Sequence, residues 1–97
     1  MITLTVKSSK SEKQEVMTNI LSGALKREHA VLERSLVKTE ACLQDFEKRY
    51  GTPSSEFFAR YQNGEMDDRN DFVDWAGEYH LYMSIREQID CLEGISF

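Results

Sequence analysis

The sequence has few of the residues that break helices, form disulfides or bind metal ions. Its 97 residues include one proline, two cysteines and two histidines. Cys42 and Cys91 are too few and too far apart for a disulfide framework, so we expect two buried free thiols and a reducing compartment. His29 and His80 have no Cys, His or carboxylate at the close spacing of zinc sites.

Other catalytic patterns are also missing. No glycine-rich phosphate loop occurs, and no Ser or Cys pairs convincingly with a histidine. We therefore expect no metal, no cofactor and no enzymatic activity. Residues 1–10 lack the apolar run of a secretory signal, and no stretch is apolar enough to span a bilayer. A soluble, cytoplasmic protein is the expectation.

Aromatic residues and negative charge are unevenly distributed along the chain. The first 45 residues contain no aromatic side chain, although the chain has ten. Residues 1–50 carry nine Lys/Arg against seven Asp/Glu, whereas residues 51–97 carry three against ten. The second half therefore has a net charge near −7. Because all ten aromatic residues lie at position 46 or beyond, the second half should supply most of the core, and the first half is short of packing partners.

The remaining pattern predicts a mainly α single domain over residues 1–97. A short N-terminal strand and connector occupy residues 1–10, a long helix 11–50, a short helix 52–62 and a C-terminal helix 70–94, which together form a helical hairpin or bundle. Gly51 suits the end of the long helix, and Thr52 and Pro53 suit the cap and first residue of the next. Asn70 or Asp68 can cap the last helix.

A heptad-like seam marks the second part of the long helix. Apolar residues recur there in steps of three and four, with Thr39 at the one missing position. The seam consists of Leu32, Leu36, Leu43, Phe46 and Tyr50. An unbroken helix of this length would be roughly 60 Å long, too long for a compact domain. Two alternatives follow: a break near Gly23, or a first half that projects and packs against another chain.

The N-terminal strand has two interpretations. Residues 2–7 (ITLTVK) alternate apolar and polar, and nothing later in the chain offers a comparable strand. We expect it to pair with another chain or a copy of itself. If two copies form a ribbon, Thr3, Thr5 and Lys7 could face DNA bases and Lys10 a phosphate, as in ribbon-helix-helix regulators. A pairing strand without DNA contact is the simpler interpretation.

Four segments of the second half resemble a family of small prokaryotic proteins. They are residues 46–51 (FEKRYG), 54–58 (SSEFF), 64–68 (GEMDD) and 71–76 (DFVDWA). The family resembles antitoxin components of toxin–antitoxin modules, and the resemblance covers about residues 40–83. It implies a toxin-like partner and carries over no catalytic residue.

These observations predict a protein-interaction module that neutralises a cognate toxin. The chain should form a homodimer or a heteromeric complex and contact no membrane; a dimeric DNA-binding autoregulator is the alternative. Surplus aromatic side chains rimmed by acids should form the contact surface for a basic partner. The expected partner-binding residues are Leu32, Leu36, Leu43, Phe57, Phe58, Tyr61, Trp75, Asp71, Asp74 and Glu78.

Overall fold

The mainly α fold is confirmed. The computed structural model describes residues 2–3 and 11–96. Their elements are β1 (Ile2–Thr3), α1 (Ser11–Tyr50), α2 (Ser54–Gln62), α3 (Asn70–Glu93) and β2 (Ile95–Ser96). No helix in this described part of the chain is both long and apolar enough to cross a membrane.

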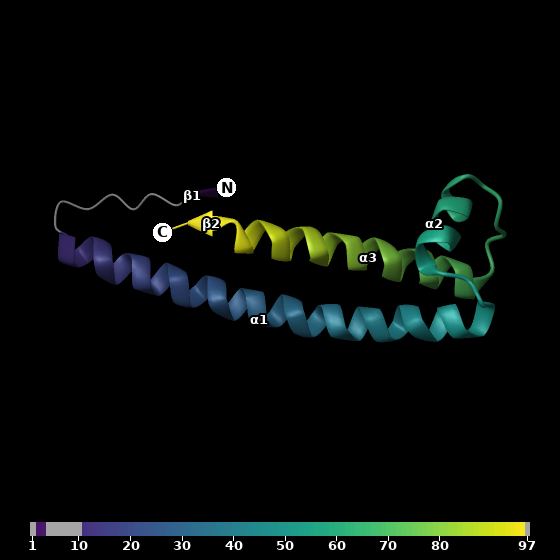
Figure 1. Ribbon diagram of the computed structural model, residues 1–97, viewed down its shortest axis with the longest axis horizontal. Coiled ribbons are helices and arrows are strands. Elements are labelled where there is room, and N and C mark those ends of the chain that lie inside the picture. The colour runs from purple at the N-terminus through teal and green to yellow at the C-terminus, as the bar shows by residue number, and fades with distance from the viewer. Residues whose placement is uncertain (1, 4–10, 97) are drawn as a thin grey trace.

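The long helix is unbroken. α1 continues through Gly23, and α3 runs back along it in the antiparallel direction, with α2 across the closed end (Figure 1). The molecule is therefore elongated, at 60 × 23 × 17 Å. One glycine costs a helix only about 1 kcal/mol, too little to break it among good helix-forming neighbours. Of the two alternatives, the break near Gly23 is thus wrong.

The heptad-like seam of α1 packs against α3. Leu43 and Phe46 belong to one buried cluster, and Leu32 belongs to a second, nearer the open end. Thr39 is buried between them, as its place in the seam predicts. The seam is therefore an intramolecular interface that holds the hairpin together.

Aromatic stacking joins all three helices at the closed end. Phe57 of α2 stacks on Trp75 of α3, with ring centroids 3.9 Å apart and planes 2° apart. Phe46 of α1 stacks on Trp75 from another side. The buried Trp75 Nε1–H donates to Ser54 Oγ at 2.9 Å, so its polar group is satisfied.

The turn between α1 and α2 depends on a distant carboxylate. Gly51 has a φ of 64°, the left-handed conformation expected there. The expected cap at Thr52 and helix start at Pro53 are wrong, because α2 begins at Ser54 and Thr52 Oγ1 donates to Tyr50 O instead. The Ser54 N–H donates to Glu47 Oε2 at 2.8 Å, so α1 supplies the cap.

The start of α3 also differs from the expectation. Arg69, and not Asn70 or Asp68, occupies the N-cap position, without a side-chain cap. Asp67 instead accepts hydrogen bonds from the Arg69 backbone N–H and guanidinium, at 2.7–3.0 Å. These bonds lower the pKa of Asp67 to about 2 and fix the turn before α3.

The structure does not support the predicted N-terminal strand as a whole. Of the predicted strand, the structure describes only Ile2–Thr3, which forms β1 and pairs in parallel with β2 (Ile95–Ser96) of the same chain. The expectation that no later segment offers a partner is therefore wrong for these two residues. Val6 and the rest of the predicted strand lie outside the described residues.

Candidate functional site

Four of the expected partner-binding residues are buried within the chain. Leu32 and Leu43 lie in the α1–α3 seam, and Phe57 and Trp75 are each 1% exposed. In the folded hairpin these side chains pack against the chain's own helices, because two long helices and a short third one close over them. Their assignment to an interface stays a prediction.

Three others are partly exposed but belong to the edges of the core. Leu36 packs against the cluster nearer the open end. Phe58 and Tyr61 pack against the aromatic cluster, and Phe58 contacts Tyr79 with ring centroids 5.0 Å apart. Their exposed edges can border a contact surface without forming its centre.

The three acids of α3 expected to bind a partner do not act as one group. Asp71 is tied to α1, because its Oδ2 accepts hydrogen bonds from the Tyr50 hydroxyl at 2.5 Å and from Arg49 Nη1 at 3.2 Å. The first of these bonds raises the pKa of Tyr50 above its ordinary 10.0. Asp74 and Glu78 instead line an open hollow between α1 and α3.

This hollow, here called the acidic hollow, has a volume of about 460 Å³. α1 contributes Cys42 and Phe46, and α3 contributes Val73, Asp74, Gly77 and Glu78. Cys42 and Phe46 are four residues apart on α1, and Asp74 and Glu78 are four residues apart on α3. The members of each pair therefore lie one turn apart on the same face of their helix. The result is an apolar floor with two carboxylates on one wall.

The charges of the acidic hollow are uncompensated within the described residues. No Lys, Arg or His of this part of the chain forms an ion pair with Asp74 or Glu78. Val73 is also exposed beside them. An aliphatic stem with a cationic head, as in Lys or Arg, matches such a surface.

Gly77 leaves the floor of the acidic hollow open. A Cβ built on Gly77 would meet no atom within 4 Å. Glycine in a helix interior costs about 0.5–1 kcal/mol relative to alanine. No packing within the described residues requires glycine here. Because Gly77 has no side chain, another molecule can approach the backbone of α3 closely at this position.

A second surface lies on the first half of α1, the part that the sequence predicts to project and pack against another chain. Val16, Met17, Ile20 and Val31 are exposed and lie outside the α3-facing seam. Their spacing along the helix is that of an amphipathic face, and this face is separate from the acidic hollow.

The expected DNA-binding residues gain no support. Thr3 lies in β1, whose pairing is parallel and within one chain, unlike the antiparallel ribbon between two copies. Thr5, Lys7 and Lys10 lie outside the described residues. DNA binding stays a prediction.

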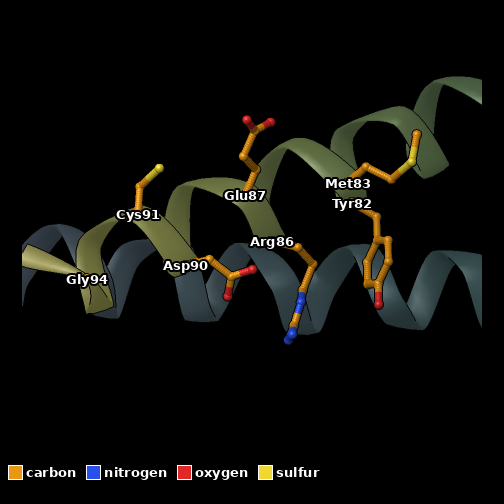
Figure 2. Close-up of a pocket in the computed structure, with 7 residues that line it drawn as sticks. All are labelled: Tyr82, Met83, Arg86, Glu87, Asp90, Cys91 and Gly94. Carbon is orange, nitrogen blue, oxygen red and sulfur yellow. The ribbon is translucent and has the colours of Figure 1, made fainter. Parts of the chain in front are cut away.

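A further hollow, of about 640 Å³, lies along the C-terminal part of α3. Its lining residues are Tyr82, Met83, Arg86, Glu87, Asp90, Cys91 and Gly94. In Figure 2 the side chains of Glu87 and Cys91 point away from those of Arg86 and Tyr82. Because these polar groups do not converge on one point, the hollow is a weaker candidate than the acidic hollow.

The two cysteines lie on the surface of the molecule, one on each long helix. Cys42 and Cys91 are both exposed, so the expectation of buried thiols is wrong. Each lies on the solvent side of its helix, where it borders a hollow. Within residues 2–3 and 11–96, no three His, Cys, Asp or Glu side chains are grouped to hold a metal ion.

Comparison with known proteins adds no assignment. No protein family, no curated protein and no solved structure matches the chain.

Proposed function

We propose that this protein is an interaction module that binds a basic segment of another protein in the acidic hollow, and that this partner is a toxin-like protein which it neutralises. One observation carries the binding proposal: Gly77 leaves open space beside the unpaired carboxylates of Asp74 and Glu78.

The acidic hollow suits a cationic side chain better than an apolar one. A bound Lys or Arg would place its stem on Phe46 and Val73 and its charge between the two carboxylates. The negative charge of residues 51–97, with ten acids against three bases, would steer a basic partner toward this half of the molecule.

The toxin-like class of the partner rests on the resemblance of residues 46–76. In the segment 71–76, Phe72, Trp75 and Ala76 are buried, whereas Val73 and Asp74 face the acidic hollow. The segment therefore combines core residues with a surface that a partner can contact.

The test uses the product of the gene beside the one for this protein, because members of the family that residues 40–83 resemble are often encoded beside short toxin-like genes. Asp74→Lys with Glu78→Lys should weaken binding by at least about tenfold, as expected when like charges replace an ion pair. In a growth assay the same variant should no longer rescue cells that express the toxin-like neighbour. Glu65→Lys with Asp68→Lys makes the same change of charge on exposed acids outside the hollow.

The control variant should retain binding and rescue. Equal loss in both variants would reduce the effect to net charge and remove the acidic hollow as the site. Absence of any complex between the wild-type proteins at micromolar concentration would contradict the proposed function itself.

A further inference from the structure

A separate apolar stripe runs along the first half of α1. Met17 and Ile20 are 45% and 57% exposed, and Val31 is 45% exposed. Ala24 is exposed between them. Ile20 and Val31 are eleven residues apart, about three turns, so they lie on one face. Leu32, one residue further, is buried against α3, so the stripe belongs to a different face.

The spacing of the stripe is that of a second helical seam. Met17, Ile20, Ala24, Arg27 and Val31 follow steps of three, four, three and four. Such a repeat favours packing of knobs into holes against another helix. No helix among the described residues of this chain covers it, since α3 occupies the neighbouring face.

Gly23 flanks the middle of the stripe, on the side of Arg27. The nearest atom to a Cβ built on Gly23 is Nη1 of Arg27, at 3.4 Å, and this is the far end of a flexible side chain. No other element of the described chain requires glycine there. Gly23 and Ala24 together leave room for the backbone of an approaching helix.

The charges favour a second copy as that helix. Residues 11–35 carry four Lys/Arg and four Asp/Glu, so two copies of this segment do not repel one another. α3, by contrast, carries one Arg and six acids, which disfavours self-association through that helix. The first half of α1 is thus the surface on which two copies of this acidic chain can meet.

We infer that the stripe from Met17 to Val31 pairs with the same stripe of a second copy, in the antiparallel direction. A two-fold axis between Leu25 and Lys26 places Ile20 opposite Val31 of the second copy, and Ala24 opposite Arg27. The long Arg27 side chain then meets the small Ala24, Ile20 meets Val31, and Met17 faces the side chain of Arg34 at the edge of the contact. A parallel pair would place Arg27 against its own copy, with like charges in contact.

The interface is small, so the dimer forms with a dissociation constant on the order of micromolar. Sedimentation equilibrium of the full chain tests this over a wide range of concentration. Ile20→Glu with Val31→Glu should leave a folded monomer, since both positions are exposed. Val37→Glu adds a charge at a residue of α1 that is 67% exposed and outside the stripe, and it should leave the dimer intact.

A monomeric wild-type chain at every concentration would overturn the pairing, and so would equal disruption by Val37→Glu. A gain-of-function variant guards against misfolding of the double mutant. Arg27→Leu removes the one charge from the stripe and should tighten the dimer about tenfold. Unchanged or weaker association of Arg27→Leu would count against the pairing.

The direction of pairing is tested by electron paramagnetic resonance. A spin label at position 13 is introduced as Lys13→Cys, with Cys42→Ser and Cys91→Ser. The antiparallel pair separates the two labels by roughly 38 Å, at 1.5 Å per residue over the offset between copies. A separation below about 20 Å would indicate parallel helices and overturn the proposed geometry.

Discussion

Trp75 of α3 donates its indole Nε1–H to the hydroxyl of Ser54 at the start of α2, 2.9 Å away. Both residues are buried, at 1% and 3% exposure. Ser54→Ala would leave the indole N–H unsatisfied, which typically costs about 1–3 kcal/mol. Urea unfolding followed by the fluorescence of the single tryptophan measures the loss directly.

The matched control for this prediction is Ser55→Ala. Ser55 is exposed and next to Ser54, so its replacement should leave the midpoint of unfolding nearly unchanged. Similar midpoints for Ser54→Ala and Ser55→Ala would show that the buried hydrogen bond adds nothing to stability.

The bond from Tyr50 to Asp71 predicts an alkaline transition. Because the bond to the Asp71 carboxylate favours the neutral phenol, Tyr50 has its pKa raised above 10.0. A raised pKa stabilises the fold below pH 10, and that contribution is lost as pH rises through the folded value. The difference in absorbance between the wild type and Tyr50→Phe isolates this one phenol. The midpoint of this absorbance titration should lie above pH 10.0 in the wild type and should fall when Asp71→Asn removes the carboxylate. A wild-type midpoint at or below pH 10.0 argues against the bond.

Asp67 predicts sensitivity to acid. The hydrogen bonds from Arg69 lower its pKa from 3.8 to about 2. Its contribution to stability is therefore complete above pH 4 and is lost as pH falls through 2. Asp67→Asn should flatten the dependence of unfolding free energy on pH between 4 and 2, measured by denaturant titration. Asp68→Asn removes an equal charge without removing the contacts to Arg69, and it should keep the wild-type slope.

The helices could be predicted from sequence because their signals are local. The steps of three and four through Leu32, Leu36 and Leu43 predicted a helical seam, which was expected to contact a partner and instead packs within the chain, and Gly51 predicted the end of α1. Those features depend on residues within one or two turns of the chain.

The wrong predictions concern contacts that depend on how the chain folds back. The cap of α2 comes from Glu47, seven residues before Ser54, and its carboxylate reaches that N–H only because the turn after α1 folds back on the helix end. Phe57 and Trp75 differ from surface aromatics only because the hairpin closes over them. Likewise, Ile2–Thr3 gains a partner from the opposite end of the chain.

The exposed cysteines predict accessible thiols. Cys42 and Cys91 should both react with a thiol reagent in the folded protein, without added denaturant. Two thiols per chain should be counted by Ellman's assay under native conditions. Reaction of fewer than two before unfolding would mean that one of these side chains is covered, for example in an assembly.

Gly77→Ala separates the stability of the fold from the function proposed for the acidic hollow. A Cβ at this position meets no atom within 4 Å, and alanine is the better helix former, so unfolding should cost about 0.5–1 kcal/mol more. The larger Gly77→Met should fill the acidic hollow and weaken binding of the basic partner, whereas stability should not fall below that of the wild type. Thermal unfolding and calorimetric titration with the partner measure the two effects. A Gly77→Met variant that binds as tightly as the wild type would show that the partner does not enter the hollow, because the methionine side chain occupies the space that its cationic residue needs.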